Sequence, residues 1–203
     1  MSEFNGFNRI VKYRPARGFT LVELMITIFV AFILMALALP SFRAVIISNH
    51  VTEATNSLLT DLNLARSEAV HRGTLVALVN NNGTGSSDWS GGWKVIADSV
   101  FKNDGTFTDT KDATLRVNSG VDTASKYSVT SKVTVSASAS GITPTDGAII
   151  FTAQGNLLPK ATSYDFNVCR PDSNPAQSKR ITIVTSGMMT TTTGTGSSPA
   201  PGC

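Results

Sequence analysis

The chain opens with a basic, polar segment that gives way to a long apolar run. From Leu24 to Phe42 no residue is charged, and nearly every position holds Leu, Ile, Val, Met, Phe or Ala. A run of this length is enough to cross a bilayer as a helix, which needs about 20 apolar residues. We therefore expect a transmembrane helix in this part of the chain.

A second helical pattern follows the apolar run. Apolar residues recur there at spacings of three and four, which predicts an amphipathic helix; they are Val51, Ala54, Leu58, Leu62, Ala65 and Ala69. Glu68 and Arg72 are a favourable i,i+4 pair, and Gly73 is a typical helix stop. Residues 19–72 are thus expected to form one helix of about 80 Å, at roughly 1.5 Å per residue.

Pro40 lies inside this expected helix. A proline there removes the hydrogen bond to the carbonyl of Ala36, so it is expected to bend or loosen the helix. The alternative is a boundary between two separate helices.

After Gly73 the pattern changes to the alternation of β-strands. Strands are expected at residues 74–79, 92–97, 127–137, 148–152, 163–169 and 180–185, between turns rich in Asn, Asp, Gly and Thr. Residues 98–125 alternate short strand-like pieces with loops. The fold class is therefore α+β, an antiparallel sheet packed on one long helix.

Glu23 stands just inside the start of the apolar run. An unpaired carboxylate near the membrane centre costs about 3 kcal/mol, so this acid needs a cationic partner. Cleavage between Gly18 and Phe19 would leave the apolar helix on the mature chain and create a new amine at Phe19. In a packed assembly, that amine could reach the Glu23 carboxylate of the next subunit.

The charge of the chain is concentrated in its first 18 residues. They hold four basic residues and one acidic residue, so the N-terminus is expected to stay in the cytoplasm and the rest to be exported. The remaining chain has 13 basic and 13 acidic residues and is formally neutral. Bulk charge therefore gives no reason to expect nucleic-acid binding by the exported part.

Both cysteines, Cys169 and Cys203, lie in the exported part, where disulfides persist. Cys203 follows a polar tail, residues 190–202, that would otherwise be mobile. A bridge to Cys169 would close a loop of about 35 residues and contribute roughly 4 kcal/mol on the chain-entropy model. The alternative is two free thiols.

The sequence gives no support for an enzyme or a cofactor. It has no nucleophile elbow and no phosphate-binding loop, and its two histidines, His50 and His71, are too far apart for a helical metal pair. Five aspartates between Asp98 and Asp122 suggest Ca²⁺, but the spacing of an EF-hand loop is missing. A solvated loop is the better interpretation.

The stretch Arg17-Gly18-Phe19-Thr20-Leu21-Val22-Glu23-Leu24 resembles the leader of type IV pilins and type II secretion pseudopilins. The resemblance implies that a prepilin peptidase cuts after Gly18 and methylates the amine of Phe19. It also implies that Glu23 aligns incoming subunits during assembly. The implied partners are other pilins or pseudopilins, the inner-membrane assembly platform, and membrane lipid before assembly.

The globular part resembles the GspH/FimT family of minor pilins and the minor pseudopilin H. The similarity rests on residues 62–73, on Trp89-Ser90-Gly91-Gly92-Trp93-Lys94-Val95, and on three later segments at 150–155, 166–169 and 179–183. Some members bind DNA through a Gly-Arg-x-Arg motif near the C-terminus. At the matching place this chain has Gly187-Met188-Met189-Thr190, so only a weak basic set is left for DNA, namely Lys160, Arg170, Lys179 and Arg180. The alternative for Lys179 and Arg180 is a strand position that faces water.

These observations predict a leader (residues 1–18), a transmembrane assembly helix (19–42), an amphipathic helix (43–73) and a β-rich domain (74–203). The expected protein is a single-pass inner-membrane subunit with a periplasmic domain, which then enters a filament. The expected function is that of a minor type IV pilin that primes assembly, at or near the tip. The alternatives are the minor pseudopilin H of type II secretion and a DNA-binding minor pilin.

Overall fold

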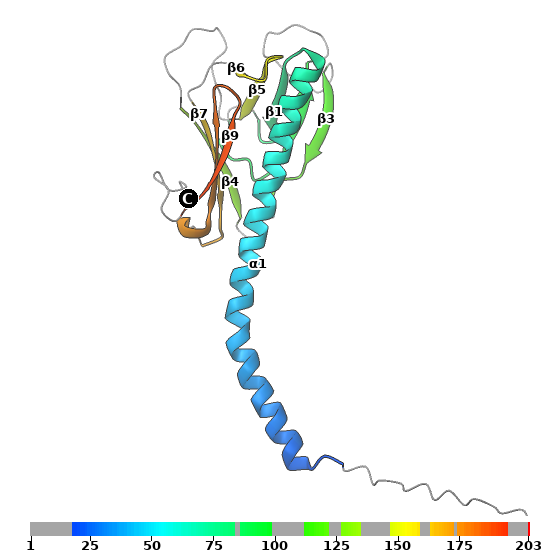
Figure 1. The fold of residues 1–203 in the computed structure, drawn as a ribbon, viewed down its shortest axis with the longest axis vertical. Helices are drawn as coiled ribbons and strands as arrows, with labels where there is room; N and C mark the ends of the chain where they lie inside the picture. Colours follow the sequence, from blue (N-terminus) through cyan, green and yellow to red (C-terminus); the bar gives the residue numbers. More distant parts are fainter. Residues whose placement is uncertain are drawn as a thin grey trace, which may run out of the picture. The chain divides into compact units, whose positions relative to one another are not determined.

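The computed structural model describes residues 18–83, 86–98, 112–121, 127–134, 147–158, 163–172, 174–194 and 203. The chain forms two compact units, Met1–Ala44 and Val45–Cys203. Helix α1 (Leu21–Arg72) contributes to both, and Figure 1 shows it with the strands of the second unit.

Thr20 caps the start of α1. Its hydroxyl accepts a hydrogen bond from the backbone N–H of Glu23 at 3.2 Å, and its carbonyl accepts one from the N–H of Leu24 at 3.1 Å. The spacing of Thr20 and Glu23 is that of a capping box. The helix continues through Pro40 as a single element, so the alternative of two separate helices is wrong. The bend expected at Pro40 stays a prediction.

The first unit exposes large apolar side chains around its helix. Phe19 is 81% exposed, and Phe29, Phe32 and Leu37 are also mostly exposed. A helix that is apolar on all sides belongs in a lipid or protein environment rather than on a water-facing surface. Within the described residues, α1 is the one helix long and apolar enough to cross a membrane.

The second part of α1 supplies one wall of the core of the second unit. Five of the six apolar positions expected in its stripe are buried, and Ala54 packs against them partly exposed. Gly73 ends the helix with a φ of 68°, and its N–H donates to the carbonyl of Ala69 at 3.0 Å. Glu68 and Arg72 form the expected ion pair at 2.7 Å.

The described strands of this unit form two antiparallel sheets. The larger has the order β3-β2-β1-β5-β6, with β1 (Val76–Asn80), β2 (Trp93–Ala97), β3 (Ala113–Asn118), β5 (Ala148–Phe151) and β6 (Leu157–Leu158). The smaller has the order β4-β7-β8-β9, with β4 (Ser128–Thr134), β7 (Ser163–Cys169), β8 (Lys179–Val184) and β9 (Met189–Thr193). A 3₁₀ helix, Pro175–Gln177, precedes β8.

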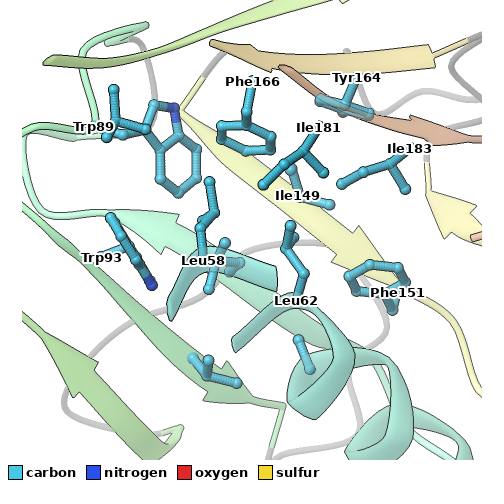
Figure 2. Packing of buried hydrophobic residues seen from close by; sticks show 14 of the residues in the cluster. Leu58, Leu62, Trp89, Trp93, Ile149, Phe151, Tyr164, Phe166, Ile181 and Ile183 are labelled. Atoms are coloured by element: carbon cyan, nitrogen blue, oxygen red, sulfur yellow. The ribbon is translucent and has the colours of Figure 1, made fainter. Parts of the chain in front are cut away.

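Side chains of β1 alternate between two apolar clusters, as the two-residue period of a strand requires. Val76 and Leu78 belong to the main core together with the helix residues, whereas Ala77 and Val79 belong to a smaller cluster with Ile96. Figure 2 shows Leu58 and Leu62 of the helix pointing into side chains of both sheets. The sheets and the helix therefore share one core.

A T-shaped aromatic pair joins the two sheets at one end of this core. Trp89, in the loop before β2, and Phe166 of β7 have ring centroids 5.1 Å apart and an interplanar angle of 81°. Both side chains are fully buried (Figure 2). Such pairs contribute about 0.5–1.5 kcal/mol beyond the area they bury.

The structure differs from the sequence prediction in several ways. The described strands form two sheets rather than one, and β6 was not expected. One of the short strand-like pieces expected in residues 98–125 is present as β3. The segment predicted as a polar tail is also partly wrong, because Thr190–Thr193 belongs to β9 and pairs with β8. Threonine is β-branched and fits an edge strand, although it gives no apolar alternation. The predicted strand end at 135–137 lies outside the described residues.

Candidate functional sites

The proposed processing site directly precedes the helix. Gly18, Phe19 and Thr20 are exposed and have no regular secondary structure. A Cβ added to Gly18 would meet nothing within 4 Å, and its φ is not in the left-handed region. The fold of this chain therefore does not require glycine at this position.

Glu23 lies in the first turn of α1. The positive end of the helix dipole favours a carboxylate here, and its backbone N–H is satisfied by the Thr20 hydroxyl. No ion pair forms between Glu23 and another of the described residues of the chain. Glu23 is exposed, and so are the apolar side chains beside it on the helix. The carboxylate is therefore accessible to a cation from another molecule.

A buried carboxylate links α1 to the larger sheet. Asp61 has no exposed surface, and its Oδ2 accepts hydrogen bonds from the indole N–H of Trp93 at 2.8 Å and the amide of Asn118 at 3.1 Å. Arg116 Nε lies 3.0 Å from Oδ1, as an ion pair outside hydrogen-bonding geometry. Sequence analysis missed this site. The signal was available, because Asp61 is at i+3 from Leu58 and so lies on the buried face.

A second polar contact ties α1 to turns of both sheets. The guanidinium of Arg66 donates to the carbonyl of Gly155, in the β5–β6 turn, at 3.0 Å. It also donates to the carbonyl of Ser186, in the β8–β9 turn, at 3.2 Å. Gly187 has a φ of 74°, and a Cβ there would lie 2.1 Å from the Gly155 oxygen. The two turns and the arginine therefore meet too closely for a side chain at Gly187.

The expected disulfide holds Cys203, the last residue of the sequence. Cys169, at the end of β7, and Cys203 are joined, with their Cα atoms 5.6 Å apart. Arg170, the residue after Cys169, donates two hydrogen bonds of 3.0 Å from its guanidinium to the Asp172 carboxylate. Desolvation raises the pKa of Asp172, but hydrogen bonds from Asn174 and Arg170 and the charge of Arg170 outweigh this and hold it below its ordinary value.

The described basic residues considered for DNA do not form an open patch, and Lys160 lies outside the described residues. Arg180 is buried, and its Nε donates to the side-chain oxygen of Asn167 at 3.1 Å. The expectation that Arg180 could face water is therefore wrong. Arg170 is also buried and pairs with Asp172, while Lys179 is partly exposed.

No group of three potential metal ligands occurs within the described parts of the chain. His71 is exposed, and the ring of His50 lies 5.3 Å from that of Tyr127. Asp98 is buried, and Asp112 is partly buried. The other aspartates of the suggested Ca²⁺ loop, Asp104, Asp109 and Asp122, lie outside the described residues.

Two family models match the sequence. Residues 54–187 match the type II transport protein GspH family, and residues 13–39 match the prokaryotic N-terminal methylation motif. The chain belongs to the GspH family. No curated protein matches it. Members of this pilin-like family are structural rather than enzymatic, so the sequence-based exclusion of an enzyme is confirmed.

Solved structures with a similar fold include the minor pilin FimU of Pseudomonas aeruginosa. It is 22% identical, with a TM-score of 0.50, over 70% of this chain and 87% of that one. The minor pseudopilin EpsH of Vibrio cholerae is 12% identical, with a TM-score of 0.42, over 71% of this chain and 97% of that one. The likeness to FimU confirms the fold predicted from the sequence, a long helix packed on antiparallel strands.

Family and motif together define the general function of the chain. It is a minor pilin or pseudopilin, a subunit of either a type IV pilus or a type II secretion system. The methylation motif implies processing by a prepilin peptidase and assembly with other pilins. It is also consistent with an inner-membrane subunit that later joins a filament.

Proposed function

We propose that the chain is a minor type IV pilin that enters the pilus at or near its tip and primes polymerisation. The observation that carries this proposal is Glu23. Its carboxylate stands in the first turn of an exposed apolar helix, and no cation of the described chain pairs with it. Filament packing would bury this charge, so a cation from a neighbouring subunit would have to compensate it.

The cation of the proposal is the amine of Phe19 in that neighbour. Phe19 is exposed ahead of the helix, and cleavage after Gly18 would make it the new N-terminus. The Phe19 amine would then pair with Glu23 across the subunit boundary. Because the pair forms only between subunits, it would favour docking without stabilising the isolated chain.

Two features support a pilus over a secretion machine. The Cys169–Cys203 disulfide is a feature that pilins often carry and pseudopilins seldom do. The fold is also like that of FimU, a minor pilin. The second candidate is the minor pseudopilin H, because the matching family is described as a type II transport protein and does not by itself decide between the two machines. Crosslinking of the full chain in membranes, with identification of its neighbours, separates the two machines.

Replacement of Glu23 by alanine tests the assembly role. Loss of a buried ion pair costs about 3–5 kcal/mol, so we expect incorporation into sheared filaments to fall at least roughly tenfold. Processing should remain normal. Glu68→Ala is the matched control, because Glu68 pairs with Arg72 of its own helix. Wild-type incorporation of Glu23→Ala would overturn the proposal.

A DNA-binding role stays a prediction with little support, because Arg180 is buried and Arg170 is paired. A gel-shift assay of the full chain across a salt series tests it. Binding that weakens steeply with salt would favour this role, since phosphate contacts release counterions.

A further inference from the structure

A groove of about 370 Å³ lies beside α1 in the second unit. One wall is a face of the helix that includes His50, Glu53 and Ser57. The opposite wall is the segment Asn118–Val121, which begins at the last residue of β3, together with Tyr127 before β4. The volume is at the small end of the range for ligand sites, which suits a single side chain better than a chain segment.

Hydrogen bonds hold the wall opposite the helix in place. The Asn118 amide donates to Ser57 Oγ at 2.7 Å as well as to the buried Asp61. The N–H of Gly120 donates to Asn118 Oδ1 at 2.9 Å, and the N–H of Val121 donates to the carbonyl of Ser90 at 3.1 Å. The groove is therefore preformed, so a ligand would not have to order this wall.

The charges around the groove favour a cation. Among the described lining residues, none is Lys or Arg, His50 is the only one that can carry a positive charge, and Glu53 is the only acid. Its side chain is 80% exposed, 3.9 Å from the His50 ring nitrogen. The rings of His50 and Tyr127 stand at 49° to one another at the same site, and the face of a tyrosine ring attracts cations. Asp61 adds no net charge, because Arg116 neutralises it.

We propose that this groove receives the cationic side chain, lysine or arginine, of a neighbouring filament subunit. Glu53 would supply the counter-charge and Tyr127 an aromatic face, with the Asn118–Val121 wall limiting the depth. The identity of the neighbour rests on the proposed function, whereas the preference of the groove for a cation does not. The contact would give the globular domain its own docking interaction, separate from that of Glu23.

Titration of the full-length protein in detergent micelles tests the preference for a cation. The probes are methylguanidinium and methylammonium, with methylurea and acetate as neutral and anionic counterparts, at constant ionic strength. The chain has two tryptophans, so the indole N–H signal of Trp93, which lines the groove, can be followed beside that of Trp89 as an internal reference. We expect saturable shifts of the Trp93 signal with the two cations only.

Two variants make this result specific to the groove. Glu53→Gln should weaken the response to cations roughly fivefold, because it removes the charge from the hydrogen-bonding group. Glu68→Gln, on the same helix but paired with Arg72, should leave it unchanged. Equal shifts with methylurea, shifts with acetate, or an undiminished response in Glu53→Gln would each overturn the proposal.

Incorporation of the same variants into filaments tests whether the groove is used for docking. We expect Glu53→Gln to be processed normally and incorporated less than Glu68→Gln. If Glu53→Gln binds cations weakly but is incorporated normally, the docking role is wrong, while the role of Glu23 is unaffected. If Glu23→Ala alone is incorporated normally, the proposed function fails and the cation preference of the groove stands.

Discussion

The indole of Trp93 donates a hydrogen bond of 2.8 Å to the fully buried carboxylate of Asp61. This bond crosses from helix α1 to strand β2. The same carboxylate accepts a hydrogen bond from Asn118, at the end of β3, and forms an ion pair with Arg116, in the middle of β3. A buried charge is costly unless it is paired and hydrogen-bonded, so this network fixes which face of the helix meets the larger sheet.

Asp61→Ala should be among the most destabilising single changes in the domain. It leaves the Trp93 N–H and the Asn118 amide without their acceptor and Arg116 without its counter-charge. We expect a loss of about 3–5 kcal/mol in the free energy of unfolding, measured with denaturant on the detergent-solubilised chain. Glu68→Ala removes a more exposed ion pair and should cost less than about 0.5 kcal/mol. Similar losses in the two variants would contradict this account of Asp61.

Gly187→Ala and Gly73→Ala form a matched pair. Both glycines have a backbone conformation in the left-handed region, with φ of 74° and 68°. An alanine at either position therefore carries a backbone strain of about 1–2 kcal/mol. A Cβ at Gly73 meets nothing within 4 Å, whereas one at Gly187 lies 2.1 Å from the Gly155 oxygen and 2.9 Å from Arg66 Nε. Gly187→Ala should therefore cost about 1–3 kcal/mol more. Thermal unfolding of both variants measures the difference, and equal midpoints would contradict it.

Loss of the Cys169–Cys203 disulfide should destabilise the domain through its unfolded state. The cysteines are 34 residues apart, which corresponds to about 4 kcal/mol on the chain-entropy model. The double variant Cys169→Ala and Cys203→Ala should lose about this much. Its unfolding midpoint should not respond to a reducing agent, whereas that of the wild-type chain should fall. A wild-type midpoint unaffected by complete reduction would count against the role of the bridge.

Asp172 should give a small pH dependence of stability. Because its pKa is lowered in the folded protein, its carboxylate stabilises the fold above the unfolded pKa of about 3.9, and this is lost as pH falls through the folded pKa. The side chain is half exposed, so water screens the effect. Asp172→Asn should slightly lower the unfolding midpoint at about pH 7 and have a smaller effect at about pH 2. A larger effect in acid would contradict the direction of the shift.

Replacement of Gly18 by leucine should block processing without damaging the fold. A Cβ at this position meets nothing within 4 Å, and Gly18 lies outside the second unit, so the unfolding midpoint of that unit should be unchanged. We expect an unprocessed precursor on a gel and an N-terminus that still includes the leader. Normal maturation of Gly18→Leu would argue against the site.

The sequence was informative where a pattern is local. The helical spacing from Val51 to Ala69 predicted the buried face of α1, and the apolar alternation of residues 163–169 predicted β7 with its observed bounds. Strand β9 was missed because its four consecutive threonines show no apolar alternation. It is recognised as a strand only from its pairing with β8 in the folded chain. Pairing depends on distant residues that no local pattern reveals.

The candidate sites divide in the same way. Gly18, Phe19 and Glu23 belong to one short motif and were found from it, although their roles stay predictions. The hydrogen-bond partners of Asp61 lie at least 32 positions away in the sequence, and those of Arg66 at least 89 positions away. Only the folded chain brings these residues together. Arg180 was misjudged because alternation along a strand does not say which face a second layer will cover.

The junction at Arg66 has a consequence for how this domain can diversify. The guanidinium of Arg66 donates hydrogen bonds to the turns of two hairpins that lie far apart in the sequence. An insertion in either hairpin would pull a carbonyl out of reach and leave the arginine only half satisfied. Relatives that lengthen one of these loops should therefore also have exchanged the arginine, so the histories of the two loops and this helical position are expected to be linked.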